Sequence, residues 1–444
     1  MVYKQEIAVI DFGGKNSQLI ARYIRDLKVY SEMFPHTVTA DKIAEKKPLG
    51  IVFSDGAAEF FAEGANGFDK EILKLGLPIL EISYGRDGSD NLEPIGDRGY
   101  KATLCENDDG DKKLLSQFLF GVCSAKDDWT MKAFVDGQIA EIREKVGNGR
   151  VLCAMSGGVD SAVCATLVHR AIGNQLTCVF VNTGLMRKYE PEEVEQVFKN
   201  EQGLNLKIID AEARFLKLLE GVTDPERKRK IIGEEFIRVF EDEAGKIGTV
   251  DFLVQGTIYP DIIESGIGKS KLVKSHHNVG GLPDVIDFKE IIEPLRDLFK
   301  DEVRAVGFEL GLPDKIVLRQ PFPGPGLGIR VIGDLTKEKL DILRDVDYIF
   351  REEIAAVGLN TEIWQYFAIL TGMKSVGVVD NERVYRYTVA LRAVDSIDAM
   401  TAEWHRIPFE VLASASKKIT DNVKEVGRVV YDITAKPPST IEWE

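Results

Sequence analysis

Cysteine and histidine are scarce in this sequence, and the spacing of the cysteines argues against two kinds of site. The 444 residues include five cysteines and five histidines. An odd number of cysteines, with no pair spaced as CxxC, disfavours both the disulfide framework of a secreted protein and a structural zinc site. The sequence also has no low-complexity tract and no internal repeat, so we expect ordinary globular domains.

Long apolar runs and an excess of positive charge are also missing. No stretch approaches the roughly 18 apolar residues of a membrane-spanning helix, and the N-terminal MVYKQEIAVIDF lacks the apolar core of a signal peptide. We therefore predict a cytoplasmic protein with no membrane association. With 57 basic and 72 acidic residues the net charge is -15, which disfavours nucleic-acid binding. A small phosphorylated ligand needs only a local basic pocket and stays possible.

The first part of the chain alternates strand-like and helix-like segments. The buried run IAVID at 7–11 precedes a segment with helical spacing of apolar residues at 18–27, and strand-like runs follow at 50–54 and 78–84. Strands that alternate with helices predict a parallel α/β sheet. We expect this unit to span residues 1–123.

A second α/β series follows a predicted helix at 129–146. Its expected strands are 151–155, 177–182, 206–210 and 252–255. This pattern predicts a doubly wound parallel sheet, which binds ligands at the carboxyl ends of its strands. Residues 258–284 lack periodicity and are expected to form a loop.

The last third of the chain predicts a smaller α+β unit. The proline- and glycine-rich RQPFPGPGLG at 319–328 interrupts the chain. A helix is expected at 337–357, and strands are expected at 375–379, 384–394 and 428–434.

The sharpest motif is Ser156, Gly157, Gly158, Val159, Asp160 and Ser161, between a predicted strand and a predicted helix. The glycines allow a tight turn, and the backbone N–H groups of such a turn and of a helix N-terminus bind anions. The GK[ST] ending of a Walker A loop is absent. The motif resembles the pyrophosphate loop of the N-type ATP pyrophosphatases, which implies ATP binding. Asp160 either holds Mg²⁺ or caps the helix.

Residues from about 128 to the end resemble the GMP synthetase family. The segments that carry the resemblance are TDPERKRKIIG at 223–233, QGTIYPDIIE at 255–264, KSHHNVGG at 274–281, QPFPGPGL at 320–327 and YDITAKPPSTIEWE at 431–444. The family adenylates XMP with ATP and then aminates it. The resemblance implies that Arg229, Lys436 and Glu442 bind XMP, although without it Arg229 reads as part of a solvated helix face. Tail residues 431–444 are expected to be ordered, with Trp443 as an anchor.

The same resemblance makes the segment around KSHHNVGG a lid over the nucleotides. It places Glu264 and Lys269 in this lid and implies catalytic roles for Asp160, Lys274, His276 and His277. The two adjacent histidines show no third metal ligand, so a metal site there is disfavoured.

The front of the chain resembles a class I glutamine amidotransferase domain through DFGGKNSQLIARYIRDLKVYSEMF at 11–34 and PILEISYG at 78–85. In this resemblance Ser83 stands at the position of the nucleophilic cysteine, and the His-Pro-Glu element is missing. Asp55-Gly56-Ala57 replaces the usual Gly-Gly-Pro. A glutaminase needs an activated thiolate with a histidine base, so we predict that glutamine hydrolysis is lost and ammonia is used. The remnant could be a docking surface, an allosteric module or a scaffold.

These observations give three predicted domains: an amidotransferase-like domain at 1–123, an ATP pyrophosphatase domain at 124–317 and a C-terminal dimerisation and XMP-binding domain at 318–444. The predicted fold is two doubly wound parallel sheets, flavodoxin-like and adenine-nucleotide-hydrolase-like, plus an α+β domain. The resemblance implies a homodimer and allows a separate ammonia-supplying partner. The alternatives are a paralogue that aminates another purine nucleotide, a tRNA-thiolating enzyme and a non-catalytic nucleotide-binding regulator.

Overall fold

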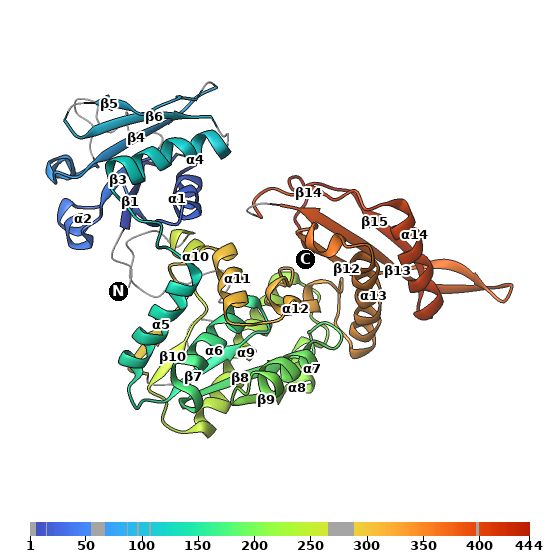
Figure 1. The fold of residues 1–444 in the computed structure, drawn as a ribbon. Helices are drawn as coiled ribbons and strands as arrows, with labels where there is room; N and C mark the ends of the chain where they lie inside the picture. The colour runs from blue at the N-terminus through green and yellow to red at the C-terminus, as the bar shows by residue number, and fades with distance from the viewer. Residues whose placement is uncertain are drawn as a thin grey trace. The chain divides into compact units, whose positions relative to one another are not determined.

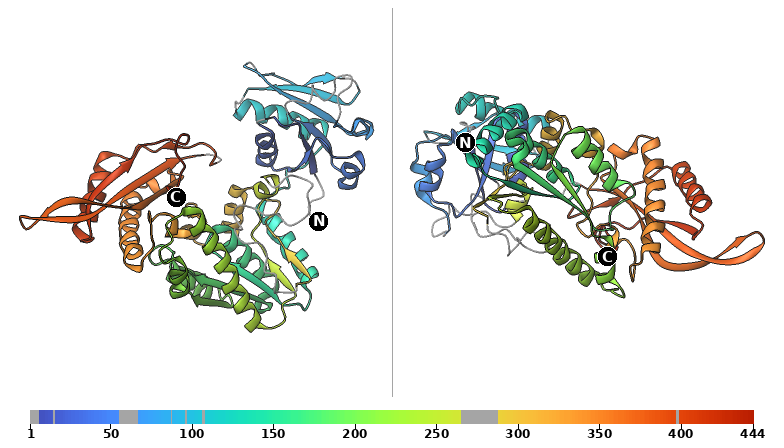
Figure 2. Two further views of the ribbon diagram at one scale, coloured as in Figure 1. Left: turned by 180° about the vertical axis from the view of Figure 1, so that it is seen from behind. Right: turned by 90° about the horizontal axis from the view of Figure 1, so that it is seen from below.

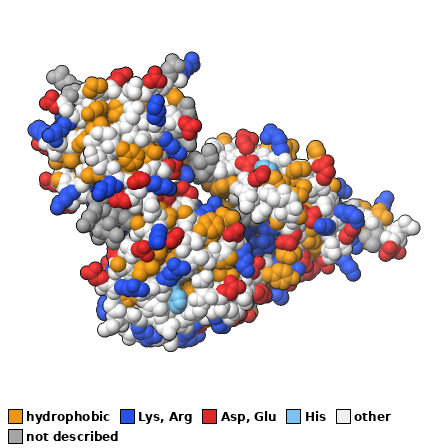
Figure 3. All heavy atoms as spheres, viewed as in Figure 1, with side chains coloured by type: hydrophobic (Ala, Val, Ile, Leu, Met, Phe, Trp, Pro, Cys, Tyr) orange, Lys and Arg blue, Asp and Glu red, His pale blue; other side chains and the backbone are white. Residues whose placement is uncertain are grey.

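The computed structural model describes residues 6–14, 16–54, 67–86, 88–95, 97–105, 108–264, 288–396 and 399–444. The chain divides into two compact units. One comprises Met1–Glu144, Thr257–Val273 and Leu295–Glu309, and the other comprises Lys145–Gly256, Lys274–Pro294 and Leu310–Glu444. Among the residues that the structure describes, no helix combines the length and apolar content needed to span a bilayer. Acidic and basic side chains are mixed over the face drawn in Figure 3.

The first unit contains a six-stranded sheet with the order β2-β1-β3-β4-β6-β5. All neighbouring strands are parallel except the pair β5–β6. The strands are β1 Glu6–Asp11, β2 Tyr30–Pro35, β3 Gly50–Phe53, β4 Ile79–Tyr84, β5 Glu93–Ile95 and β6 Gly99–Leu104. The helices of this part are α1 Ser17–Asp26, α2 Ala40–Lys46, α4 Asp108–Ser116 and α5 Met131–Val146, with a 3-10 helix at Lys70–Lys74 and a π-helix at Gln117–Val122 (Figure 1).

Strand β1 shows why this unit is a buried parallel sheet. Ile7 and Val9 pack in the core on one face of the sheet, and Ala8 and Ile10 pack in the core on the other face. All four are fully buried. A strand covered on both faces has no solvent side, so its sequence is a continuous apolar run and not an alternating one.

Two helices from the middle of the chain belong to this first unit, namely α10 Tyr259–Glu264 and α11 Lys300–Glu309. Tyr259 and Phe299 lie in the same core as β1 and α1. The buried guanidinium of Arg25 on α1 donates to the carbonyl O of Asp297 and forms an ion pair with Glu302 at 2.7 Å. The prediction of a loop at 258–284 is therefore wrong where α10 forms, at Tyr259–Glu264. Residues 265–284 lie outside the described residues.

The second unit contains a five-stranded parallel sheet with the order β11-β10-β7-β8-β9. Its strands are β7 Val151–Met155, β8 Leu176–Asn182, β9 Leu206–Asp210, β10 Phe252–Val254 and β11 Glu290–Ile292. The associated helices are α6 Val159–Ile172, α7 Glu190–Val194, α8 Glu212–Leu219, α9 Pro225–Ile247 and α12 Asp314–Val317, with a π-helix at Glu195–Glu201 and a 3-10 helix at Gly173–Gln175. The chain runs from β7 outward to β9 and then crosses to β10, so a topological switch point lies between β7 and β10.

The end of the chain adds a mixed four-stranded sheet to the second unit. Its strands are β12 Gln365–Val379, β13 Glu382–Asp395, β14 Glu403–Trp404 and β15 Val426–Asp432. Helices α13 Lys337–Ala356 and α14 Phe409–Asn422 pack with the sheet, and 3-10 helices lie at Gly326–Ile329 and Leu359–Thr361. Figures 1 and 2 show the β12–β13 hairpin extending beyond these helices. Strand β12 begins ten residues before the start that we predicted, at Gln365 instead of Ser375.

The fold class is as predicted, with two parallel α/β sheets and a C-terminal α+β part. The limits of the two compact units, however, differ from the predicted domain boundaries after residues 123 and 317. Because α10 and α11 pack with the front sheet, residues far along the chain complete its core. Tertiary packing of this kind leaves no mark in local composition.

A buried carboxyl group in β1 predicts a pH-dependent stability. Burial, and next the nearby Glu32, raise the pKa of Glu6 from 4.5 to about 8. Since the folded-state pKa lies above the unfolded value, stability present below pH 4.5 is lost as the pH rises toward 8. Glu6→Gln should flatten the decline of melting temperature between pH 5 and 8. The same change at the exposed Glu45 should leave the decline intact, and an equal slope for both variants would contradict this assignment.

Candidate active site

The predicted phosphate loop follows β7 and opens α6. Gly157 has φ of +80°, a conformation that favours glycine. The Ser156 backbone N–H donates to Ser161 Oγ at 3.2 Å, and Ser161 Oγ in turn donates to the carbonyl O of Gly158 at 3.0 Å. These bonds close the loop on itself in front of the N-terminus of α6. The turn and its position at the sheet switch point form a suitable anion site.

Asp160 lies in the first turn of α6. The end of β10 approaches it closely, because a Cβ placed on Gly256 would lie 3.5 Å from the Asp160 Cβ. The helix begins at Val159 with Gly158 as its N-cap residue, and no side chain caps it there. Asp160 is therefore not the N-cap residue of α6. Of the two predicted roles, binding of Mg²⁺ stays a prediction.

Arg319, from the C-terminal part of the chain, forms ion pairs and donates a hydrogen bond to the backbone of the phosphate loop. Arg319 Nη1 donates to the carbonyl O of Gly157 at 2.8 Å and pairs with Glu190 Oε1 at 2.8 Å. Its Nη2 pairs with Glu193 at 3.1 Å. Glu190 is buried and also accepts the backbone N–H of Arg187 at 3.0 Å. The planar guanidinium thus fixes the loop carbonyl and two carboxylates of α7 at once.

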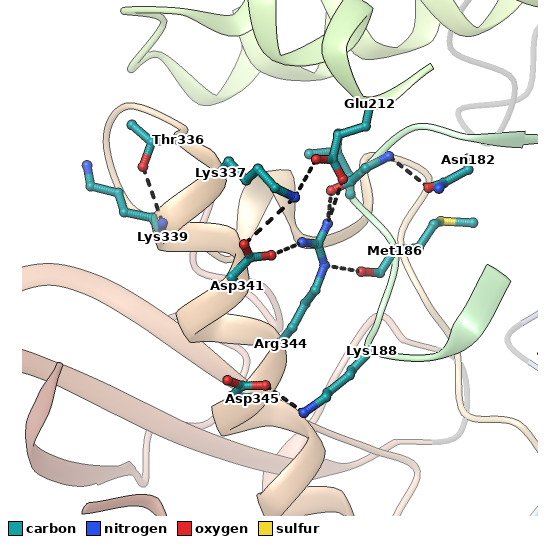
Figure 4. A network of polar contacts seen from close by, with 12 residues as sticks. Asn182, Met186, Lys188, Glu212, Thr336, Lys337, Lys339, Asp341, Arg344 and Asp345 are labelled. Carbon is teal, nitrogen blue, oxygen red and sulfur yellow. Dashed lines mark hydrogen bonds and ion pairs between the residues drawn. The ribbon is translucent and has the colours of Figure 1, made fainter. Parts of the chain in front are cut away.

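The loop after β8 is held by helix α13 (Figure 4). Arg344 on α13 donates to the carbonyl oxygens of Gly184 and Met186. The carbonyl O of Leu185 accepts the backbone N–H of Leu327 at 2.8 Å. A Cβ on Gly326 would lie only 2.3 Å from this oxygen, so the approach requires glycine. The helix and the glycine turn together fix a second loop at the carboxyl edge of the sheet.

The C-terminal tail is ordered, as predicted. Arg392 is fully buried and its guanidinium forms five hydrogen bonds. Its partners are the Asp432 carboxylate, the Ser439 hydroxyl and the carbonyl oxygens of Thr434, Thr440 and Ile441. Trp443 is not the main anchor, because its side chain is 41% exposed and tethered through Nε1 to Asp432 at 2.9 Å. The buried arginine replaces the hydrophobic anchor that the sequence suggested.

Of the three predicted XMP residues, Glu442 is the one that lines a pocket. It lines an open pocket of about 730 Å³ formed by Val430, Tyr431, Asp432, Ile433, Thr434, Pro438, Ser439, Thr440, Glu442 and Trp443. Arg330 forms a bidentate pair with its carboxylate at 3.0 and 2.7 Å, and Gln365 donates to it at 3.2 Å. Arg330 is almost completely buried, so the orientation of Glu442 is fixed.

The other two predicted XMP residues contact the protein itself. Arg229 donates to the main-chain O of Glu444, and its neighbour Lys228, fully buried, pairs with the Glu444 carboxylate. The Lys436 ammonium donates to the carbonyl O of Ala399 at 2.8 Å. Helix α9 therefore binds Glu444 in the tail, a contact that the sequence analysis did not predict.

Several predicted residues cannot be compared with the structure. Lys269, Lys274, His276 and His277 lie outside the described residues, as do Asp55–Ala57, and of Glu264 only the backbone is described, at the end of α10. Sequence reasoning missed Arg319, Arg330, Gln365, Arg392 and Glu190. The only available signal was the turn-rich segment RQPFPGPGLGIR, which begins at Arg319 and ends at Arg330. Its glycines indicate that its backbone lies close to another part of the chain.

Ser83 lies inside β4 and not at a turn. Its Oγ is 3.1 Å from Thr103 Oγ1 on β6. In the described residues between β4 and β5 there is no helix, whereas a nucleophile elbow exposes its residue between a strand and a helix. His36 follows β2, three strands away in the sheet order, which at the usual spacing is about 14 Å. This histidine cannot serve as a base for Ser83.

Three family models match the chain. They are Glutamine amidotransferase class-I at residues 8–87, the tRNA methyl transferase HUP domain at 149–208 and the GMP synthase C terminal domain at 352–443. With the phosphate loop and the arginine-bound tail, these matches define an ATP-dependent ligase with an amidotransferase-type front domain.

The chain belongs to the GMP synthase family. It is 53% identical to the glutamine-hydrolysing GMP synthase of Acetivibrio thermocellus over 506 aligned positions. It is 51% identical to that of Ruminiclostridium cellulolyticum and 50% identical to that of Caldicellulosiruptor saccharolyticus over the same length. Each alignment covers 99% of both chains. A chain of 444 residues leaves at least 62 of the 506 positions without a residue, so it lacks segments that these relatives have.

The Arg319 contact predicts a defect in ATP binding. Arg319→Lys keeps the charge, but one ammonium group cannot serve Gly157 and both carboxylates. We expect the Kd for ATP to rise about tenfold, which corresponds to about 1.4 kcal/mol, as measured by calorimetry. Arg238→Lys changes an exposed arginine of α9 and should bind ATP as the unchanged protein does. Equal affinities for all three proteins would show that Arg319 does not position the loop.

Proposed function

We propose that this protein adenylates XMP with ATP and then aminates it to GMP, releasing AMP and pyrophosphate. One observation carries the proposal: the phosphate loop and the arginine-bound tail belong to one compact unit and are tied to the same C-terminal segment. A loop that binds pyrophosphate and an ordered tail with a fixed carboxylate suit a ligase with two nucleotide substrates. The names of the relatives support GMP as the product, and the choice of XMP rests on the family resemblance.

The proposed chemistry has two steps. The O2 oxygen of XMP attacks the α-phosphorus of ATP, which forms adenyl-XMP and expels pyrophosphate. Ammonia then attacks C2, the bond to the adenylate oxygen breaks, and AMP leaves. In this scheme residues 156–161 bind the ATP phosphates, while Glu442, Lys436 and Arg229 hold XMP. Lys274, His276 and His277 as catalytic groups, with Glu264 and Lys269 in the lid, rest on the family resemblance alone.

Magnesium fits this site through Asp160. Asp160 is in the first turn of α6, where the phosphate loop ends, and Mg²⁺ in nucleotide sites is held by one or two carboxylates together with substrate phosphates. The described residues contain no group of three metal-ligating side chains, so Asp160 would share the ion with ATP. When bound, the ion would neutralise charge on the transferring phosphoryl group.

We propose further that ammonia, and not glutamine, supplies the nitrogen. Ser83 in a strand, the distance to His36 and the shortened chain all support the loss of glutaminase chemistry. The second candidate is a glutamine-hydrolysing enzyme. It is favoured by the amidotransferase match at 8–87 and by the names of the relatives.

The cytoplasmic location of the protein stays a prediction.

The nitrogen donor can be tested on the intact protein. AMP and GMP are measured after mixing ATP, XMP and Mg²⁺ with either ammonium or glutamine. We expect products with ammonium, and less than a hundredth of that rate with glutamine, because a serine without a base is a poor nucleophile. Ser83→Ala should leave the ammonium rate unchanged. Equal rates with both donors, together with glutamate release, would establish the glutamine-hydrolysing alternative. Products with neither donor would favour the paralogue or the nucleotide-binding regulator.

We also propose a homodimer formed through the β12–β13 hairpin. Val376 pairs with Tyr385 across the hairpin, and Val378 lies on the same face two residues further on. The exposed fractions of the three residues are 46, 71 and 70%. Clustered exposed apolar side chains of this kind mark interaction surfaces.

This surface predicts the effect of a charge on assembly. Val378→Asp should convert a dimer of the 49.4 kDa chain to a monomer in light scattering at micromolar concentration, since a charge buried in an apolar interface is costly. Leu218→Asp, at an exposed leucine of α8, should stay dimeric. A monomeric unchanged protein would refute the proposed dimer, and a dimeric Val378→Asp variant would move the interface elsewhere.

A further inference from the structure

Arg187 is a buried positive charge without a carboxylate partner among the described residues. Its side chain is 4% exposed. Its Nε has no hydrogen-bond partner in the described structure, and its Nη2 makes a single long bond of 3.4 Å to the carbonyl O of Pro321. A buried charge with so few partners destabilises the folded state. A ligand with a negative charge would supply the missing contacts.

The other arginines around Arg187 are already paired. Their carboxylate partners are Glu190 for Arg319, Glu442 for Arg330 and Asp347 for Arg351. Burial lowers the pKa of Arg187 to about 9, Glu190 raises it, and these three arginines lower it. Since arginine keeps its charge at neutral pH, the lowered pKa means that the charged group is less stable here than in water.

Arg187 is connected to the phosphate loop through its backbone. Its N–H donates to Glu190 at 3.0 Å, and Glu190 pairs with Arg319. Arg319 holds the carbonyl O of Gly157. The backbone of Arg187 is thus fixed by the same contacts that fix the phosphate loop.

The guanidinium of Arg187 contacts Pro321 and Phe322, which also contact two residues that bind Glu442. It lies 4.1 Å from the centre of the Phe322 ring, and Arg330 lies 5.2 Å from the same ring. Pro321 O accepts from Arg187 and also from Gln365, which donates to Glu442. Arg187 therefore stands between the phosphate loop and the carboxylate that lines the tail pocket.

We propose that Arg187 is a further substrate-binding residue, which takes a phosphate oxygen of a nucleotide bound in this site. The choice of nucleotide rests on the proposed function. Two sources share the required chemistry: the phosphates of ATP, released as pyrophosphate, and the 5′-phosphate of XMP. The long bond to Pro321 is weak enough to exchange for a charge-assisted bond to such an oxygen.

Arg187→Met tests this proposal, because methionine keeps the contact with Phe322 but removes the charge. Binding is measured by calorimetry on the full chain, with inorganic pyrophosphate plus Mg²⁺ in one arm and XMP in the other. Neither arm needs turnover, so failure to make GMP would not obscure the result. We expect at least tenfold weaker binding in one arm, which identifies the source, and a melting temperature equal to or above that of the unchanged protein.

Arg351→Met is the matched control. Arg351 pairs with the buried Asp347 at 2.8 Å, so its loss leaves a carboxylate buried and unpaired and should lower the melting temperature. Binding of both anions should be unchanged in this variant. The proposal is overturned if Arg187→Met binds both anions normally. It is also overturned if its melting temperature falls as far as that of the control, because the arginine would then be structural.

Discussion

The arrangement of the candidate site depends on one constraint: buried arginines must find acceptors, and the acceptors come from distant parts of the chain. Arg392 binds five groups of the tail, Arg330 binds Glu442, and Arg319 binds Gly157 and α7. A buried guanidinium without partners is strongly destabilising, so each of these bonds fixes its segment. The ordered tail and the shape of the phosphate loop follow from this requirement.

The same constraint links structure to chemistry. Adenylation requires two nucleotides in one orientation, and positioning of reacting groups supplies much of the rate in such reactions. Here the loop after β7, the loop after β8 and the tail are each attached to the segment between Arg319 and Arg344. A shift of this segment would disturb the binding of both substrates together. Arg187 is the exception, since no carboxylate pairs with its charge in the part of the chain that the structure describes.

Much of the fold could be predicted from the sequence, because strands such as 151–155 and helices such as Lys337–Ala356 have strong local patterns. The phosphate loop was also accessible, through its glycine spacing, whereas the contact of α9 with the tail was not predicted. The packing of α10 and α11 on the front sheet was not, because it depends on Arg25, Tyr259 and Phe299 meeting across more than 200 residues. The arginine contacts were missed for the same reason: an arginine in a sequence does not reveal its acceptor.

The most direct test of a single centre for both nucleotides is isotope exchange between labelled pyrophosphate and ATP. It is measured with Mg²⁺ and XMP and without any nitrogen donor, so that only the adenylation step can run. Exchange that requires XMP is the predicted result, because pyrophosphate is released only when XMP attacks ATP in the same site. Exchange at the same rate without XMP, or no exchange at saturating XMP, would contradict the account.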